Sequence, residues 1–185
     1  HSDWSFQLQP PSATLLYALE VPEVGGDTAF TNQYLAFESL SESMQSILRD
    51  LKGLHSAERS YGPRGTFGQP DPDSSMHIQG DETAVVLQTH PLVRSHPLTG
   101  RQSLFVNEVY TVGIEGMTKT ESSALLEFLF EHSRQIAFTC RVRWTPGTLT
   151  MWDNRATQHF AINDYSGSKR EMYRITLAGE QPVLN

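Results

Sequence analysis

Residues 138–144 carry the pattern that most constrains the fold, because apolar and polar side chains alternate strictly along them. The apolar set is Phe138, Cys140, Val142 and Trp144, and the polar set is Thr139, Arg141 and Arg143. Such alternation is typical of a half-buried β-strand and predicts Cys140 in the core. Pro146-Gly147 predicts a turn into a second strand at residues 148–152. Residues 158–162 and 171–178 are expected to be the last two strands, so most of the second half should be antiparallel sheet that closes on itself.

The remaining segments predict helices, further strands and one long loop. Residues 13–21 favour a strand, and residues 31–37 and 39–51 favour helices. Thr118 and Glu121 have the spacing of a capping box, which predicts the start of a helix that runs to about His132. Residues 61–81 are rich in Gly, Pro, Asp and Ser and predict a candidate lid loop or a disordered segment. Residues 83–88 and 103–106 predict a pair of strands. We expect a mainly β (α+β) single domain spanning residues 1–185.

Composition excludes several classes of protein. The net charge of −7 over 185 residues disfavours a nucleic-acid partner, because binding a phosphate backbone needs basic residues. Cys140 is the single cysteine, so the chain forms no internal disulfide and no thiolate metal cluster. No apolar run reaches the roughly 20 residues of a membrane span. We expect a cytoplasmic protein without a membrane partner, and we expect it to assemble as a homo-oligomer.

His1 and Asp3 are candidate metal ligands. Residues two apart in a strand point to the same side, so this imidazole and this carboxylate can share one ion. His159, in the predicted strand 158–162, is the candidate third ligand. Two histidines and one carboxylate form a facial triad that suits non-haem Fe(II), and the same residue types also suit catalytic zinc. The simpler alternatives are a surface terminus for His1 and Asp3 and an ordinary structural histidine at 159.

Two arginines follow, Arg170 directly before the last predicted strand and Arg174 within it, and if that strand is regular from residue 170 on they lie on one face. They are then roughly 13 Å apart along it, so two inward guanidiniums need two different anions. A dicarboxylate co-substrate on the metal suits one and an anionic substrate suits the other, because guanidinium binds carboxylate and sulfonate in a bidentate manner. No acidic residue on the same strand face compensates Arg174. The turn Gly25-Gly26-Asp27-Thr28 adds a hydroxyl able to donate to a carboxylate. Surface salt bridges are the alternative for both arginines.

Several motifs of specific order and spacing run through the chain. They are His1-Ser2-Asp3-Trp4-Ser5-Phe6, Gly25-Gly26-Asp27-Thr28, residues 90–97 (HPLVRSHP), residues 105–108 (FVNE), residues 152–159 (WDNRATQH), Asp164-Tyr165 and residues 169–174 (KREMYR). In this combination the chain resembles, along essentially its whole length, the TauD/TfdA family of Fe(II)- and 2-oxoglutarate-dependent dioxygenases. This group contains the taurine dioxygenases, alkylsulfatases and aryloxyalkanoate dioxygenases.

The resemblance implies roles for the candidate ligands. It implies that His1, Asp3 and His159 ligate Fe(II), and that Thr28 and Arg170 hold the distal carboxylate of 2-oxoglutarate. The implied domain is a single Fe(II)/2-oxoglutarate dioxygenase catalytic domain, and the implied fold is a double-stranded β-helix, a jelly roll with flanking helices. Family members carry a segment before the H-x-D strand, so we expect the N-terminal part of the family fold to be missing.

The resemblance also implies a substrate site. Arg174 is expected at an anion subsite that touches substrate or co-substrate, Tyr110 is the implied aromatic pocket residue, and Phe6 is expected against the apolar part of the substrate. The predicted function is hydroxylation of a small organic anion with O2, releasing succinate and CO2. The anion is expected to be a sulfonate, an alkyl sulfate or an aryloxyalkanoate.

Two other functions stay open from the sequence. A non-catalytic jelly-roll module could bind an anion without turnover, although such a module has no need of the three metal ligands. A zinc hydrolase could use the same two histidines and carboxylate. Thr28 and the paired arginines fit a dicarboxylate co-substrate better, and oxygen uptake that depends on 2-oxoglutarate and Fe(II) would separate the three functions.

Overall fold

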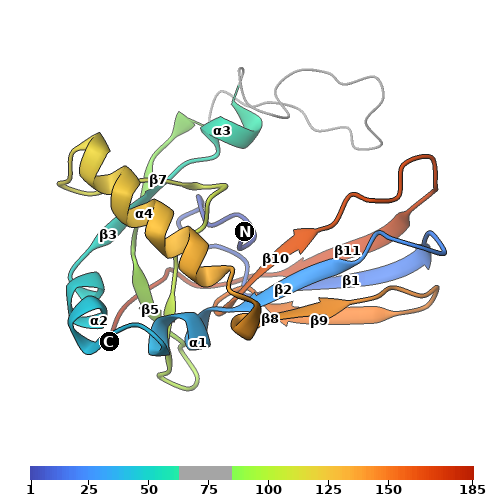
Figure 1. The fold of residues 1–185 in the computed structure, drawn as a ribbon, viewed down its shortest axis with the longest axis horizontal. Coiled ribbons are helices and arrows are strands. Elements are labelled where there is room, and N and C mark those ends of the chain that lie inside the picture. The colour runs from blue at the N-terminus through green and yellow to red at the C-terminus, as the bar shows by residue number, and fades with distance from the viewer. Residues whose placement is uncertain (63–84) are drawn as a thin grey trace.

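The structure is a computed structural model that describes residues 1–62 and 85–185 (Figure 1). It consists mainly of strands with a few helices, which confirms the predicted β-rich class. Long strands fill one side of the molecule, and the helices with shorter strands fill the other (Figure 1). The lid loop predicted at residues 61–81 lies, except for its first two residues, outside the described residues.

The first long sheet joins β11, β1 and β9 in that order, with antiparallel pairing. Its strands are β1 Ala13–Glu20, β9 Leu149–Asp153 and β11 Glu171–Leu177. Leu16 lies opposite Arg174, and Thr14 lies opposite Trp152. Because directly paired residues and residues two apart point to the same side, one face of the sheet presents Thr14, Trp152 and Arg174 together.

The second long sheet joins β10, β2 and β8. Its strands are β2 Thr28–Asn32, β8 Thr139–Val142 and β10 Thr157–Ala161. His159 lies opposite Phe30 in this sheet. The two sheets meet through aromatic rings, because the ring of Trp152 lies 5.2 Å from that of Phe30 and 4.9 Å from that of His159. The inner faces of the two long sheets therefore face each other.

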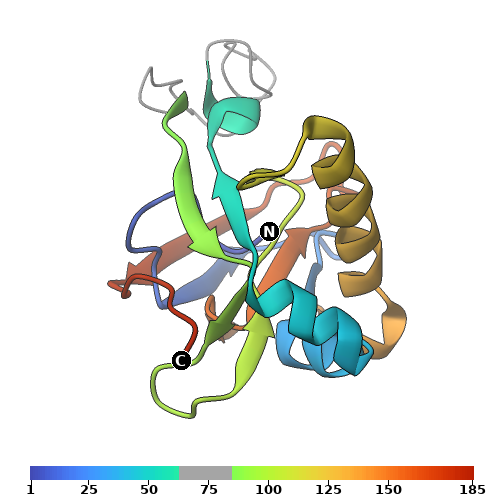
Figure 2. The same cartoon turned by 90° about the vertical axis from the view of Figure 1, so that its left-hand side faces the viewer.

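Shorter strands and the helices enclose the main apolar core. In one sheet β3 Lys52–His55 pairs with β4 Gln88–Pro91 and β7 Thr111–Ile114, and in another β5 Val93–Ser95 pairs with β6 Gln102–Leu104. The helices are α1 Gln33–Glu38, α2 Glu42–Arg49, α3 Glu58–Tyr61 and α4 Lys119–Ser133, and η2 Ile136–Phe138 is a short 3-10 helix. Helices α1, α2 and α4 pack on the short strands (Figure 2), with Leu48 and Leu129 fully buried in one cluster with Leu92 and Val93.

Side-chain caps explain where the longer helices begin. The predicted capping box of α4 is confirmed: the hydroxyl of Thr118 accepts from the N–H of Glu121, whose carboxylate accepts from the N–H of Thr118. At α2, the Oγ of Ser41 accepts from the N–H of Met44. These bonds satisfy N–H groups that the first turn of a helix leaves free.

The predicted burial of Cys140 is wrong, because Cys140 is exposed. Strand β8 is an edge strand, and it is shorter than the alternating segment: Phe138 belongs to η2 and Trp144 lies past the strand's end. Trp144 is the member of the pattern that is buried. Alternation therefore identified a strand here but not which of its side chains the rest of the molecule covers.

Of the strands predicted at residues 83–88 and 103–106, the second overlaps β6 and the first meets β4 only at Gln88. Strand β4 begins at Gln88 and pairs with β3, whereas β6 pairs with β5. Residues 83 and 84 lie outside the described part of the chain. In the ranges that the structure describes, no helix has the length and apolar character to cross a bilayer.

Candidate active site

The backbones of His1 and His159 are hydrogen-bonded to each other. The backbone nitrogen of His1 donates to the carbonyl of His159, and the N–H of His159 donates to the carbonyl of His1, each at 2.9 Å. The Oγ of Ser2 donates to the carbonyl of Asn154 at 2.6 Å. These bonds hold the opening segment along β10 and bring Asp3 next to both imidazoles.

His1, Asp3 and His159 offer three ligand atoms that lie within 4.8 Å of one another. The Oδ1 of Asp3 is 3.5 Å from Nε2 of His1 and 3.9 Å from Nε2 of His159. Two atoms bound to one metal at about 2.1 Å can lie at most about 4.2 Å apart, so both distances fit a shared ion. The donor set fits Fe(II) and also zinc.

Asp3 is almost completely buried, and its carboxylate is held from several sides. Thr14 Oγ1 donates to Oδ2 at 2.5 Å, and Asn154 Nδ2 donates to that Thr14 oxygen at 2.8 Å. Arg174 Nη2 lies 2.7 Å from Oδ1. Burial by itself raises the pKa of Asp3, but the hydrogen bonds with His1 and Thr14 and the nearby positive charges outweigh it and hold the pKa well below its usual range. The carboxylate therefore stays ionised, as a metal ligand must.

Arg174 has an acidic partner that the sequence analysis, which considered only its own strand face, did not find. The partner is Asp3, which comes from the opening segment and not from the arginine's own strand. The side chain of Arg174 is still 43% exposed, and its guanidinium lies over the ring of Trp4 at 5.6 Å. Arg174 therefore lies directly beside the three candidate ligands with part of its side chain accessible.

His159 is kept neutral by its surroundings. Its ring lies 4.9 Å from Trp152, 6.3 Å from Phe30 and 4.4 Å from His1, between ring centroids. Burial, followed by the charge of His1, lowers the pKa of His159 to about 3. A neutral imidazole whose Nε2 faces Asp3 is the form that binds a metal.

Arg170 lies just before β11 and has an unused donor. Its Nε donates to the carbonyl of Gly26 at 3.2 Å, and its guanidinium carbon lies 6.0 Å from the ring of Trp144 and 5.9 Å from that of Tyr165. Its Nη2 is buried and makes no hydrogen bond to any residue that the structure describes. A buried charged donor without an acceptor costs stability, so this atom fits a site for an anion.

Thr28 has a hydroxyl proton available. Thr28 is buried, and its Oγ1 accepts from Nε1 of Trp144 at 3.0 Å. Because an indole N–H only donates, the hydroxyl of Thr28 keeps its own proton for another acceptor. Trp144 thus contacts both Thr28 and Arg170. Phe30, two residues further along β2 and on the same face, contacts the ring of His159, so one strand connects this group to the metal ligands.

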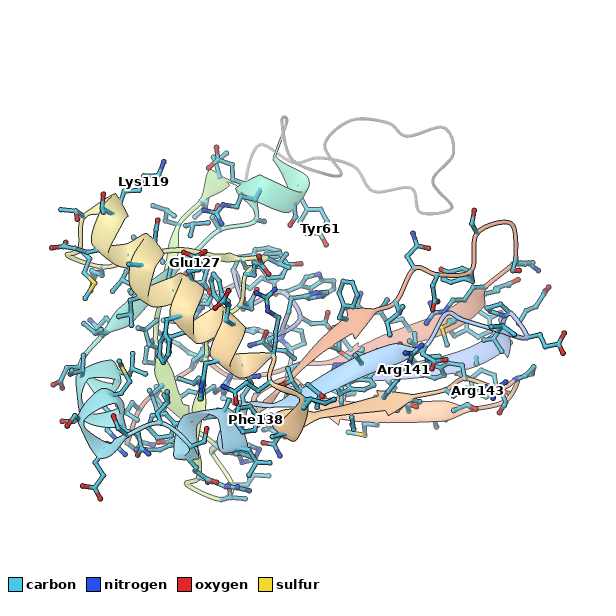
Figure 3. The ribbon with its side chains drawn as sticks, viewed as in Figure 1. Tyr61, Lys119, Glu127, Phe138, Arg141 and Arg143 are labelled. Atoms are coloured by element: carbon cyan, nitrogen blue, oxygen red, sulfur yellow. The ribbon has the colours of Figure 1, made fainter. Side chains whose placement is uncertain are left out.

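An aromatic group borders the ligands on another side. The ring of Tyr110 lies 5.7 Å from that of His1 and 5.0 Å from that of Phe6. Its hydroxyl is 3.3 Å from that of Tyr61, at the end of α3 (Figure 3). Burial and the contact with Tyr61 raise the pKa of Tyr110, so it remains a neutral phenol.

Sequence reasoning missed the roles of Thr14, Trp144, Asn154 and Tyr61. Asn154 lies inside the motif of residues 152–159, and Trp144 ends the alternating segment, so both positions carried a signal. Thr14 had none, because its contact with Asp3 depends on the distant pairing of β1 with β9 and β11.

Comparison with known proteins agrees with this arrangement. Residues 1–176 match the family described as "Taurine catabolism dioxygenase TauD, TfdA family". The chain belongs to the TauD/TfdA family. It is 39% identical over 193 residues to the alpha-ketoglutarate-dependent dioxygenase cnsM of Penicillium expansum, a match that covers 99% of this chain and 50% of that protein. It is 34% identical over 186 residues to the alpha-ketoglutarate-dependent sulfate ester dioxygenase of Pseudomonas putida, covering 99% of this chain and 60% of that protein.

A solved TauD/TfdA structure has the same fold. The crystal structure of a taurine dioxygenase from Burkholderia xenovorans superposes with a TM-score of 0.82 at 37% identity, covering 99% of this chain and 57% of that one. The chain thus spans between 50% and 60% of the length of these TauD/TfdA relatives. The family resemblance stated from the motifs is confirmed.

Proposed function

We propose that this chain carries the catalytic site of an Fe(II)- and 2-oxoglutarate-dependent dioxygenase. The observation that carries the proposal is that two imidazole nitrogens and one buried carboxylate oxygen lie within 4.8 Å of one another. His1, Asp3 and His159 would hold the metal, with Asp3 ionised and His159 neutral as binding requires. With 2-oxoglutarate and O2, bound Fe(II) supplies the oxidising chemistry that hydroxylates a C–H bond and releases succinate and CO2.

Arg170 and Thr28 are proposed to bind the distal carboxylate of 2-oxoglutarate. Arg170 contributes a buried Nη2 that finds no acceptor among the described residues, and Thr28 contributes a hydroxyl proton that its bond with Trp144 leaves free. A carboxylate that accepts from both would neutralise the guanidinium and satisfy both donors. These residues orient the co-substrate, and the rings of Trp144 and Tyr165 shield the charged contact from water.

The proposed substrate is a small organic anion. Arg174 lies beside the ligands with 43% of its side chain exposed, which makes it available to a sulfonate, a sulfate ester or a carboxylate. Tyr110 and Phe6 provide an aromatic surface for the apolar part of such a molecule. The names of the relatives that act on sulfate esters and taurine support this class, and an aryloxyalkanoate fits the same combination of arginine and aromatic rings.

The fold proposed with this function is a double-stranded β-helix in one catalytic domain over residues 1–185. Two three-stranded antiparallel sheets whose inner faces meet through Phe30 and Trp152 support it. The candidate ligands lie on those inner faces or beside them, which is where a jelly roll holds a bound group.

The decisive experiment measures succinate formed from 2-oxoglutarate with Fe(II) and a panel of sulfonates, alkyl sulfates and aryloxyalkanoates. We expect turnover that needs Fe(II) and rises with at least one anion, and no turnover with Zn(II). Hydrolysis of a test ester with Zn(II) and no succinate with Fe(II) would favour the zinc hydrolase. Anion binding without either reaction would favour a non-catalytic module.

A further inference from the structure

The glycine turn at residues 25–28 is tied to the loop between β10 and β11. The N–H of Gly26 donates to Oδ1 of Asp164 at 2.7 Å. On the other side of the same residue, the carbonyl of Gly26 accepts from Nε of Arg170 at 3.2 Å. The peptide units around Gly26 therefore connect the carboxylate of Asp164 to the guanidinium of Arg170.

The packing around this connection leaves almost no room for a side chain at either glycine. A Cβ added at Gly25 would lie 2.7 Å from Oδ1 of Asp164 and 2.9 Å from its carbonyl oxygen. A Cβ added at Gly26 would lie 3.3 Å from the ring of Tyr165 and 3.4 Å from Cδ of Arg170. Both glycines have positive φ, +84° and +71°, which side-chain-bearing residues rarely adopt. The turn is thus shaped to bring its backbone against residues 164, 165 and 170.

The second oxygen of Asp164 faces an arginine on the outside of the sheet. Arg141 on β8 (Figure 3) places Nη2 3.8 Å from Oδ2 of Asp164 and Nε 2.7 Å from Oδ2 of Asp27. Asp27 belongs to the glycine turn, and its carbonyl accepts from the N–H of Ile162 at 2.9 Å. Arg141 therefore joins the turn and the loop a second time.

We propose that Asp164 is a positioning residue for Arg170: through Gly26, it fixes the direction in which the guanidinium presents Nη2. The proposal rests on the proposed function, in which Arg170 binds the distal carboxylate of 2-oxoglutarate. Asp164 does not touch that carboxylate in this role. It acts because a guanidinium whose Nε is held by a fixed carbonyl can rotate less, so less freedom is lost when an anion binds.

The role predicts a selective loss of co-substrate affinity. Asp164→Ala removes the acceptor for the N–H of Gly26, and we expect the dissociation constant of a bound dicarboxylate to rise about fivefold, the scale of one ordinary net hydrogen bond. Asp164→Asn keeps an oxygen acceptor for that N–H, so its dissociation constant should stay within about twofold of wild type. Neither change touches the residues proposed to hold the metal.

The test titrates the Mn(II)-loaded protein with N-oxalylglycine, a 2-oxoglutarate analogue that keeps both carboxylates, by calorimetry. Mn(II) affinity is measured separately by electron paramagnetic resonance, and folding by circular dichroism. Glu121→Ala is the matched control, because it also removes a carboxylate that accepts a backbone N–H, at the start of α4. Asp164→Ser, whose Oγ is one bond shorter than Oδ1, is the second variant if Asp164→Ala does not fold. Steady-state rates add a second readout, with KM for 2-oxoglutarate raised and kcat at saturation unchanged.

The outcomes separate this inference from the function on which it rests. Weakened N-oxalylglycine binding in Asp164→Ala, with Mn(II) affinity intact and near-normal binding in Asp164→Asn, supports the role. Wild-type binding in Asp164→Ala, or in Asp164→Ser where that variant takes its place, overturns it, and so does an equal loss of Mn(II) affinity. An Asp164→Asn variant as weak as Asp164→Ala also overturns it, because the Gly26 hydrogen bond would then not be the cause. Failure of the wild-type protein to bind N-oxalylglycine at all would instead refute the proposed function itself.

Discussion

His1 and His159, 158 positions apart, exchange two backbone hydrogen bonds, and their rings lie 4.4 Å apart between centroids. This pairing makes the metal site depend on strand register. A slip of β10 by one residue would turn the ring of His159 to the opposite face of its sheet. The candidate ligands therefore come together only when the strands of the long sheets pair in the register seen here.

His159→Ala should abolish metal binding while leaving the protein folded. It removes one of three ligand atoms, and we expect Mn(II) affinity to fall at least about 100-fold, beyond the range typical of changes behind the ligands. Succinate formation should disappear with it. Mn(II) titration measures the first effect, and His132→Ala on α4 is the control that removes a histidine elsewhere. Undiminished Mn(II) affinity in His159→Ala would refute the assignment of this ligand.

Arg170→Ala should raise KM for 2-oxoglutarate steeply. A hydrogen bond to a charged group contributes roughly 1.5–3 kcal/mol, which corresponds to a rise of about 10- to 150-fold. Thr28→Val, which keeps the shape but removes the hydroxyl, should cost about fivefold. Steady-state kinetics with varied 2-oxoglutarate measures both, and Arg143→Ala is the control, because Arg143 is exposed and donates to the carbonyl of Glu23 (Figure 3). If Arg170→Ala keeps the wild-type KM, Arg170 does not bind the distal carboxylate of 2-oxoglutarate.

The parts of the fold and site that could be predicted are those encoded by short sequence patterns. The capping box located the start of α4, and the motifs located the segments that carry His159 and Arg170. Contacts between segments far apart in the chain could not be read this way. The salt bridge of Arg174 with Asp3 depends on where the opening segment lies on the β1 sheet, and no spacing within β11 encodes it.

The same limit applies to burial. Alternation along residues 138–144 identified a strand but could not show that β8 lies at a sheet edge, where Cys140 is exposed. Trp144, from the same pattern, is buried because it packs beside Thr28 and Arg170. Whether a strand's apolar face is covered depends on its neighbours, and those are set by the topology of the whole chain.

Gly25→Ala should destabilise the protein more than Gly147→Ala. The two glycines have nearly the same left-handed backbone, with φ of +84° and +86°. A Cβ at Gly147 would meet no atom of residues 1–62 or 85–185 within 4 Å, so its cost is the backbone strain alone, about 1–2 kcal/mol. A Cβ at Gly25 would also lie 2.7 Å from Oδ1 of Asp164, so the turn or the loop must move. Urea unfolding measures both free energies, and equal losses would show that the turn does not pack as tightly as described.

The stability of the protein should fall as the pH drops below about 6.5, and His55 should be one cause. His55 is completely buried, with Nδ1 3.1 Å from Oγ of Ser5 and its ring 5.3 Å from that of His90. Burial, followed by the charge of His90, lowers the pKa of His55 from 6.5 to about 3. The pKa of His90 is lowered as well, mainly by burial.

The pKa of His55 is 6.5 in the unfolded chain and about 3 in the folded protein. Between these two values the unfolded chain binds a proton at His55 that the folded protein excludes. The free energy of unfolding therefore decreases as pH falls through this window, with a slope that approaches about 1.4 kcal/mol per pH unit for one such histidine. His55→Asn removes this titration, so its unfolding free energy should depend less on pH between about 6.5 and 3 and should differ from wild type by a constant above pH 7. Urea unfolding at a series of pH values measures both curves. Parallel curves across the acidic window would mean that His55 takes up its proton without unfolding, and that its burial does not exclude the charged ring.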